Sequence, residues 1–157
     1  MIHLRLVYVG KTAFPEMDQA IERYMDRLRH YVSVQVHLVK AEKIGEKGRD
    51  ETVRDREGER ILKLVGDREM LVALDRQGSQ LSSEGLAVYL DELAARGASK
   101  IWWAVGGPVG HSPKVLERAD RILALSKMTF PHDLTRLILV EQLYRAFTIL
   151  KGEPYHR

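Results

Sequence analysis

Cysteine is absent from the chain, which excludes disulfides and thiolate metal sites. No uninterrupted apolar run reaches about 18 residues, so we expect no membrane-spanning helix. The first residues, Met1 to Arg5, alternate apolar and polar side chains instead of showing the basic start, apolar middle and cleavage site of a signal peptide. These absences agree with a cytoplasmic protein, and we expect that location.

Several common catalytic and binding motifs are also missing. The histidines have neither H-x-x-x-H spacing nor a shared helical face, so we expect no metal site. No G-x-S-x-G is present, which argues against a serine hydrolase of the α/β type. The chain has no G-x-G-x-x-G, and no G-K-[ST] follows its glycine-rich segment, so the dinucleotide and P-loop fingerprints are both lacking.

What is present is an ordinary globular composition. The 157 residues are 45% hydrophobic and 30% charged, which suits one domain over residues 1–157 with a sizeable core. The formal net charge is +3. A basic balance permits a polyanionic partner, because lysine and arginine release counterions from nucleic acid, but a charge this small indicates little by itself.

The apolar periodicity predicts strands that alternate with helices. Strands are expected at Ile2–Val9, Val32–Val39, Met70–Leu74, Ile101–Val105 and Arg121–Leu125. Helices are expected at Pro15–His30, Glu51–Val65, Ser83–Gly97, Ser112–Ala119 and Leu134–Leu150. This order predicts an α/β fold with a mostly parallel sheet, and the near-continuous apolar strands indicate helices on both of its faces.

Some segments carry more specific expectations. Val32–Val39 alternates as a half-buried strand does, and Trp102 and Trp103 should point to opposite faces of theirs. Lys40–Asp50 resembles a mobile loop. The helix over Glu51–Val65 interleaves charges of both signs, so we interpret it as solvated rather than facing RNA.

Three loops follow strand ends in the second half of the chain: 75–81, 106–112 and 126–133. Ligands bind beyond the carboxyl ends of strands in an open α/β sheet, so these loops are the main indication of a site. The loop Gly106–Ser112 has three glycines within five residues, which fits a tight turn and a cofactor cradle equally well. The loop at 126–133 combines hydroxyls, a lysine and a histidine with Met128 and Phe130, which favours a functional loop over a plain connector.

The last residues, Lys151–Arg157, are polar and end in a tyrosine, a histidine and an arginine. The residues alone favour a frayed terminus. The functional alternative is a tip that contacts RNA, with an aromatic ring stacking on a base and Arg157 on phosphate.

Taken together, these segments resemble a known family. They are Leu74-Asp75, the strand from Ile101 with its Gly-Gly-Pro-x-Gly loop, Ser126-Lys127-Met128-Thr129-Phe130-Pro131-His132, the run from Val140 to Ala146, and Pro154-Tyr155-His156-Arg157. The pattern is similar to the RlmH family, the pseudouridine N3-methyltransferases of large-subunit ribosomal RNA in the SPOUT superfamily. The resemblance covers essentially the whole chain, and its motifs are long and ordered.

The resemblance implies a SPOUT fold whose C-terminal part forms a trefoil knot, a rare exception to unknotted topology. It implies S-adenosylmethionine as methyl donor, bound by Leu74, Gly106, Leu125, Ser126, Lys127, Met128, Thr129 and Phe130. It also implies a homodimer in which each site is completed by the partner chain, with the assembled ribosome as substrate. His111 stands where relatives often carry leucine; we interpret it as a solvent-facing turn residue and assign it no role.

Methylation of N3 requires the base nitrogen to lose its proton and to align with the methyl group. His132 is our first candidate for the general base or orienting group, because imidazole exchanges protons near neutral pH. Tyr155, His156 and Arg157 are candidates for gripping the RNA. This division of roles is our inference, and a protein this small and weakly basic should need a target base that is already exposed or flipped out.

Two other functions are consistent with parts of the sequence. The chain could dock on ribosomes without chemistry, which predicts no affinity for S-adenosylmethionine. It could also be another SPOUT methyltransferase, such as one acting on transfer RNA, although the Pro154–Arg157 ending favours ribosomal RNA. No motif supports nucleotide hydrolysis.

Overall fold

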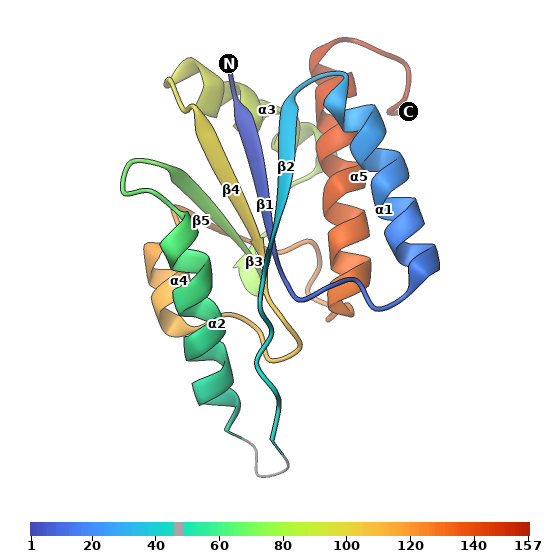
Figure 1. The fold of residues 1–157 in the computed structure, drawn as a ribbon. Helices are drawn as coiled ribbons and strands as arrows, with labels where there is room; N and C mark the ends of the chain where they lie inside the picture. Colours follow the sequence, from blue (N-terminus) through green and yellow to red (C-terminus); the bar gives the residue numbers. More distant parts are fainter. Residues whose placement is uncertain (46–48) are drawn as a thin grey trace.

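The computed structural model describes residues 1–45 and 49–157, and its centre is one sheet of parallel strands (Figure 1). The strand order is β2-β1-β4-β3-β5, and each neighbouring pair runs parallel. The expected α/β class is therefore confirmed. The strands are β1 (His3–Val9), β2 (Ser33–Val39), β3 (Met70–Ser79), β4 (Lys100–Val105) and β5 (Arg121–Leu123).

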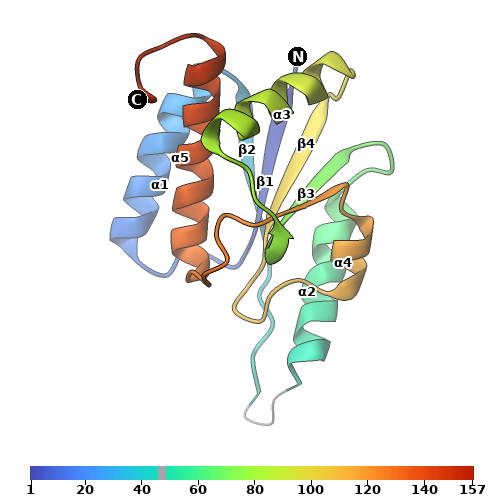
Figure 2. The same cartoon turned by 180° about the vertical axis from the view of Figure 1, so that it is seen from behind.

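Helices cover both faces of this sheet, as the apolar strands predict. The larger core lies beneath α1, α3 and α5, and a second core lies beneath α2 and α4 (Figure 2). The helices are α1 (Pro15–Arg29), α2 (Asp50–Leu64), α3 (Ser83–Ala95), α4 (Pro113–Arg118) and α5 (His132–Leu150). None of the helices in residues 1–45 and 49–157 has the length and apolar character that crossing a bilayer requires.

The two tryptophans of β4 confirm the expected alternation. Trp103 is fully buried in the larger core, whereas Trp102 packs in the second core on the opposite face. The indole nitrogen of Trp102 donates to Glu69 Oε2 at 2.6 Å, so the ring is oriented as well as buried. Each face of the sheet is thus anchored by one indole at neighbouring positions in the chain.

The edge strand β2 differs from its predicted pattern. Val34 and Val39 are buried, but Val36 and Leu38 are 40% and 53% exposed. The alternation was read correctly as a strand, but burial requires a covering layer, and β2 lies at the sheet edge with a neighbour on one side alone. Of the expected Lys40–Asp50 loop, residues 40–45 and 49 have no regular structure and Asp50 begins α2; residues 46–48 lie outside the described residues.

The strand expected at Met70–Leu74 extends through polar residues to Ser79. Ala124 N donates to Ser79 O at 2.9 Å, so backbone pairing across a register shift replaces the apolar signal. A Cβ on Gly78 would lie 2.5 Å from Ile122 O, and glycine is therefore what permits this close approach. The strand expected to reach Leu125 ends at Leu123, and α5 begins two residues earlier than expected, at His132.

The topology places a ligand crevice where β3, β4 and β5 end. From β3 the chain passes through α3 to β4 on one side, and from β4 through α4 to β5 on the other side of β3. Because α3 and α4 pack on opposite faces, β3 lies at a topological switch point, where open α/β sheets bind ligands at the carboxyl edge.

Candidate functional site

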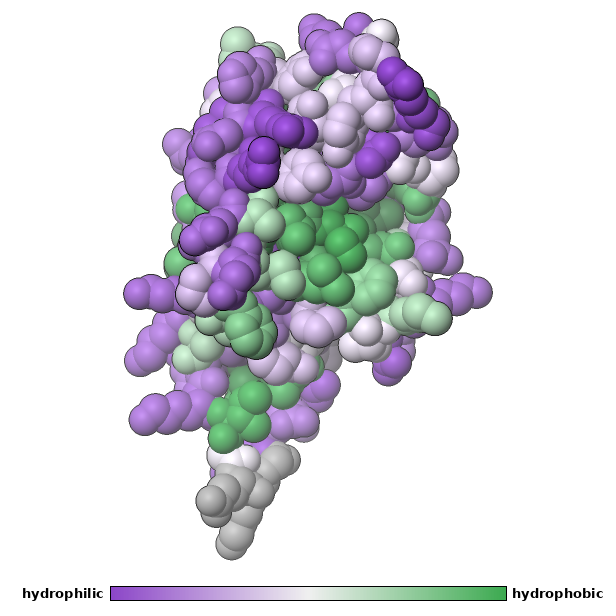
Figure 3. All heavy atoms as spheres, turned by 90° about the vertical axis from the view of Figure 1, so that its right-hand side faces the viewer, coloured by the Kyte–Doolittle hydropathy of each residue, from purple (hydrophilic) through white to green (hydrophobic). Residues whose placement is uncertain are grey.

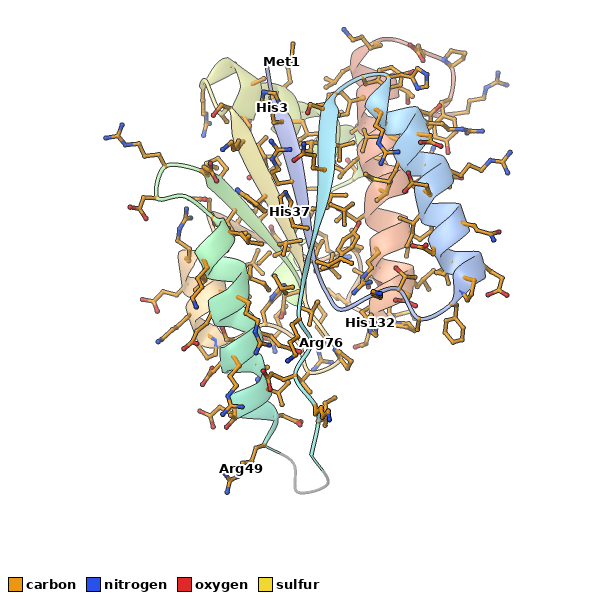
Figure 4. The ribbon with its side chains drawn as sticks, viewed as in Figure 1. Met1, His3, His37, Arg49, Arg76 and His132 are labelled. Carbon is orange, nitrogen blue, oxygen red and sulfur yellow. The ribbon has the colours of Figure 1, made fainter. Side chains whose placement is uncertain are left out.

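A cleft of about 930 Å³ opens at the carboxyl edge of β3, β4 and β5. Its walls come from the three loops that the sequence singled out, together with the start of α5, Leu116 of α4 and Arg54 of α2. Figure 4 shows His132 and Arg76 at this lower end of the sheet. A volume of this size lies in the range of roughly 300–1,000 Å³ that is typical of small-molecule and cofactor pockets.

Most of the sequence-predicted site residues meet in this cleft. Those that line it are Leu74, Gly106, Leu125, Ser126, Met128, Thr129, Phe130 and His132. Lys127 belongs to the same loop but is not among the lining residues. The predicted residues come from three separate strand ends, so it is the parallel order of the sheet that brings them together.

The glycine-rich loop turns tightly at the cleft wall. Gly110 has φ +81°, which other residues rarely adopt, and its amide donates to Gly107 O at 3.0 Å. A Cβ on Gly106 would lie 3.1 Å from the carbonyl carbon of Gly110, so the backbone strands of this turn nearly touch. The loop leads into α4, where Ser112 Oγ accepts from Val115 N and caps the helix. The same segment can therefore serve both as a tight turn between β4 and α4 and as a backbone cradle for a bound cofactor.

The loop that joins β5 to α5 forms a second wall. Ser126 Oγ accepts from the amide of Met128 at 3.0 Å, which fixes the turn, and the Met128 side chain is 75% exposed. A large exposed apolar side chain at the edge of a cleft is suited to contact with a bound molecule. The same loop therefore lines the cleft and places an exposed apolar side chain at its edge.

His132 stands at the first position of α5, with its ring beside an acid. Its Nε2 lies 3.4 Å from Asp133 Oδ1, and Asp133 is 4% exposed. The other oxygen of Asp133 accepts from Ala13 N at 2.8 Å, so the carboxylate is held by the loop after β1. An imidazole at the cleft wall next to a fixed carboxylate can take up a proton and hold its orientation.

The C-terminal tail lies at the other end of the molecule. It follows Leu150, whereas His132 begins the same helix, and α5 has 19 residues. At about 1.5 Å per residue, roughly 27 Å separates the two ends, and Figure 1 shows the C-terminus beside the upper end of α5, away from the start of this helix. Within one chain, Tyr155, His156 and Arg157 do not reach His132, so the structure divides the predicted catalytic residues into two groups.

The tail is ordered by contacts instead of being frayed. The Tyr155 hydroxyl donates to Glu141 Oε1 at 3.0 Å and the ring lies beside Arg145, 4.7 Å from its guanidinium carbon. His156 is held on both sides, with Nδ1 3.2 Å from Arg145 Nη1 and Nε2 2.8 Å from Glu84 Oε1. Both of its ring nitrogens are engaged, which leaves this imidazole unsuited to act as a general base as it stands.

The environment of Tyr155 also keeps its hydroxyl protonated. Burial and the hydrogen bond to Glu141 raise the pKa of Tyr155 above its ordinary value. A phenol with a raised pKa can donate a hydrogen bond but does not become a phenolate near neutral pH. Arg157 is different, because its Nε donates to Pro154 O at 3.2 Å while the side chain remains exposed.

Sequence reasoning missed several residues of the cleft wall, and one assignment was wrong. His111 is not solvent-facing but 8% exposed, and it lines the cleft with Nε2 3.1 Å from Ala104 O. Burial lowers the pKa of His111, so the ring is neutral near pH 7. Asp75 to Gln77, Pro108 and Val109 lie in loops already expected to form the site, but they were given no role of their own. Missed altogether were Arg54, Leu116 and Thr135, and no sequence signal pointed to Arg54.

The cleft combines an apolar floor with backbone polar groups. Leu74, Val105 and Leu123 give it an apolar floor, and Gly106, Gly107 and Gly110 present backbone atoms to it. The Nδ1 of His111 is buried without a hydrogen-bond partner in the described part of the chain, which leaves it as an acceptor. In residues 1–45 and 49–157, no group of three His, Cys, Asp or Glu side chains could hold a metal ion.

Comparisons with known proteins agree with this geometry. A family model described as "Predicted SPOUT methyltransferase" matches residues 2–156. A protein named "Ribosomal RNA large subunit methyltransferase H" from Syntrophobacter fumaroxidans is 50% identical over 157 residues, which cover 99% of this chain and 100% of that one. A protein of the same name from Christiangramia forsetii is 41% identical over 153 residues, with 98% of each chain covered.

Solved structures support the fold alone. A probable methyltransferase from Bordetella pertussis Tohama I is similar with a TM-score of 0.58 at 12% identity, covering 93% of this chain and 96% of that one. A probable methylase family protein from Haemophilus influenzae Rd KW20 is similar with a TM-score of 0.54 at 16% identity, covering 100% of this chain and 72% of that one.

Proposed function

This chain belongs to the SPOUT methyltransferase family, and we propose that it methylates N3 of a pseudouridine in large-subunit ribosomal RNA, with S-adenosylmethionine as donor and the assembled ribosome as substrate. The observation that carries the proposal is full-length similarity, at 50% identity, to a protein named for methylation of large-subunit ribosomal RNA. A ribosomal substrate in turn favours a cytoplasmic location.

The cleft supports the choice of donor. We assign Leu74, Gly106, Leu125, Ser126, Met128, Thr129 and Phe130 to the cofactor, because they line one cavity of suitable size, and Lys127 to the edge of the same loop. When bound, S-adenosylmethionine supplies an electrophilic methyl carbon on its sulfonium sulfur. We also expect the trefoil knot in this C-terminal half, where β3 pairs with β5 and a Cβ on Gly78 would lie 2.5 Å from Ile122 O.

His132 is the residue we propose for the N3 proton. It lines the cleft, it can accept a proton, and Asp133 beside it would stabilise the imidazolium that results. This histidine stands at the N-terminus of α5, and the dipole of the helix favours the negative charge that develops on the target nucleobase. In this assignment the chain orients the base and removes its proton, and the donor needs no activation by the protein.

The tail must act from a second copy of the chain if it acts at this site. Its distance from His132 along α5 prevents an intramolecular role, whereas a homodimer with antiparallel contact could bring one chain's Arg157 to the other chain's cleft. Figure 3 views the side that carries α1 and α5 and shows an apolar area bordered by polar residues, which a second copy could cover. We therefore propose that the homodimer is the active form and that the tail grips RNA in trans.

Methyl transfer to ribosomes tests the proposal directly. Ribosomes from a strain lacking this protein would be incubated with labelled S-adenosylmethionine, and the modified nucleoside would be mapped by mass spectrometry. We expect one methyl group on a large-subunit pseudouridine, lost in His132→Ala. Label on isolated ribosomal RNA as efficiently as on ribosomes would contradict the assembled substrate, and label on transfer RNA alone would favour the alternative SPOUT activity. Cofactor binding without any methyl transfer would point to a different RNA.

A mixed dimer separates action in trans from action in cis. One chain would carry His132→Ala and the other would be truncated after Pro154, with different tags for purification. If the tail acts in trans, one of the two sites in this dimer has both His132 and a partner tail, and about half of the wild-type activity returns. Two inactive sites, despite a stable mixed dimer, would show that each chain serves its own cleft.

A further inference from the structure

Two arginines face the cleft without a part in the reaction described above. Arg54 comes from α2, and Arg76 comes from the polar extension of β3. Neither belongs to the motifs that carry the family resemblance. Figure 4 shows Arg76 at the same end of the sheet as His132. The two guanidinium groups therefore reach one cavity from two different elements.

The charge of the cleft wall is positive because of these two residues. Histidines aside, three residues with charged side chains line the cleft: Arg54, Arg76 and Asp75. Two of these side chains are positive and one is negative. The chain as a whole is only at +3, so this is a local excess rather than a general basic surface. An anion inside the cleft would meet an attractive field.

The arginines of α2 divide into two groups by their partners. Arg56 and Arg60 both form ion pairs with Glu42, on the side of the helix that faces the loop after β2. For Arg54 and Arg76, no ion pair is formed with any residue in 1–45 or 49–157. Two of the three arginines of α2 are thus paired inside the described part of the chain, whereas the one that faces the cleft is not.

Arg54 is half-buried, and its Nε is enclosed without a hydrogen-bond partner in the described part of the chain. An enclosed cationic nitrogen that lacks a partner costs free energy, which an anionic ligand would offset. The residue one turn later, Glu57, has its Oε1 3.1 Å from the place of a Cβ on Gly107, so this face of α2 adjoins the glycine loop. Arg54 consequently lies at the border between the cofactor loop and the outside.

We propose that Arg54 and Arg76 form an arginine clamp that binds backbone phosphates beside the target nucleotide. The inference rests on the proposed function, because it assumes an RNA base in the cleft. Guanidinium groups bind phosphate through paired hydrogen bonds, and a base drawn out of its stack brings its flanking phosphates to the rim of the pocket. The exposed position of Arg76 favours a large substrate arriving from solvent over the carboxylate of an enclosed cofactor.

The test compares the double variant Arg54→Gln/Arg76→Gln with a charge-matched control. The control, Arg68→Gln/Arg96→Gln, removes the same two charges from exposed positions just beyond the C-terminal ends of α2 and α3, away from the cleft. Both would be measured as full-length protein for ribosome binding across a salt series, for KM toward ribosomes, and for affinity toward S-adenosylmethionine by calorimetry. Thermal unfolding would show that each variant is folded.

The clamp predicts about tenfold weaker ribosome binding for the double variant and a smaller salt dependence, by roughly 0.7–0.9 in the log-log slope for each lost phosphate contact. The KM of the double variant for ribosomes should rise, and its affinity for S-adenosylmethionine should stay at the wild-type value. The variant Arg54→Lys/Arg76→Lys should keep most of the wild-type salt dependence of ribosome binding. Equal behaviour of the double variant and the control would overturn the clamp, and so would a loss confined to cofactor affinity, which would assign the arginines to the cofactor carboxylate. Wild-type protein that transfers no methyl group to ribosomes would instead reject the proposed function.

Discussion

Single carboxylates decide part of this protein's response to acid, and Glu69 is the clearest case. Lys100 Nζ lies 2.9 Å from Glu69 Oε1, while Gly66 N and the Trp102 indole donate to Oε2 at 3.0 and 2.6 Å. Lys100 is the main cause, and together these donors lower the pKa of Glu69 from 4.5 to about 2. A lowered folded-state pKa stabilises the fold above the unfolded value, and this contribution is lost as the pH falls from about 4.5 to about 2.

We therefore expect Glu69→Gln to be less stable than wild type at pH 7 by roughly 1 kcal/mol. The loss of stability is no larger because solvent screens the charges at this partly exposed site. The difference should shrink as the pH approaches 2, where the wild-type carboxyl is protonated too. Urea unfolding at several pH values measures this, with Glu92→Gln on the surface of α3 as the control. A difference between Glu69→Gln and wild type that stays constant with pH would contradict the assignment.

One glycine, Gly58, allows α2 and α4 to pack closely on the second face of the sheet. A Cβ on Gly58 of α2 would lie 2.3 Å from Ser112 Oγ and 3.1 Å from Val115 Cγ2 of α4. Alanine favours helix more than glycine does, by about 1 kcal/mol, yet overpacking costs about 1–3 kcal/mol. Gly58→Ala should therefore be destabilising in thermal unfolding. Gly45→Ala, where no atom lies within 4 Å of the added Cβ, should be neutral; a stabilised Gly58→Ala would show that α4 yields easily.

At the scale of elements, the start of α5 is fixed to β1 by a buried arginine. Arg136 is fully buried, donates to Val9 O at 2.8 Å and to Thr12 Oγ1 at 3.2 Å, and lies 4.7 Å from the centre of the Tyr8 ring. Asp133 is 3.9 Å away and balances the charge. Because His132 precedes Asp133, this contact positions the candidate base with the helix.

Arg136→Met should therefore destabilise the protein by about 3 kcal/mol, because it removes the buried guanidinium that balances the charge of Asp133. Asp133→Asn should cost less in the Arg136→Met background than in wild type, which a double-mutant cycle of urea unfolding measures. Independent, additive losses would show that the two side chains stabilise α5 separately. Arg29→Met, which breaks only exposed pairs with Glu22 and Asp26, is the control and should change stability little.

At the scale of the whole molecule, α5 leaves apolar side chains without cover. Leu134 and Ile138, one turn apart, are only half-buried, and neither packs against the larger core although their neighbours do. Two such residues on one helix are what a second copy of the chain would bury, which supports the proposed homodimer. The molecule by itself thus holds a cleft that most of the predicted cofactor-binding residues line, whereas its C-terminal tail lies at the other end of α5.

We expect light scattering to give about twice the monomer mass of 18.0 kDa. Ile138→Asp should shift the protein toward monomer, because a charge at an apolar contact is costly to desolvate, and methyl transfer should fall with the dimer. Val88→Asp, an equal change at a residue of α3 that is 56% exposed, should leave the mass unchanged. A monomeric wild type with full activity would contradict the role of the partner.

The sequence by itself determined the fold class and the place of the cleft. Apolar periodicity is local, so it marked the strands, and the two tryptophans of β4 faced opposite cores as alternation requires. The rule that ligands bind beyond parallel strand ends then pointed to the loops at 75–81, 106–112 and 126–133, and each contributes to the cleft wall.

The tertiary structure alone decided which residues share a surface. His156 contacts Glu84, which lies 72 positions earlier in the chain, and it also contacts Arg145. These contacts order a C-terminal tail that the residues alone predicted to be frayed. The burial of His111 and the approach of Arg54 and Arg76 to one cavity also depend on how helices pack on the sheet. A periodic pattern records the burial of a residue within its own element, whereas these contacts join elements that are distant in sequence, so no local pattern could carry them.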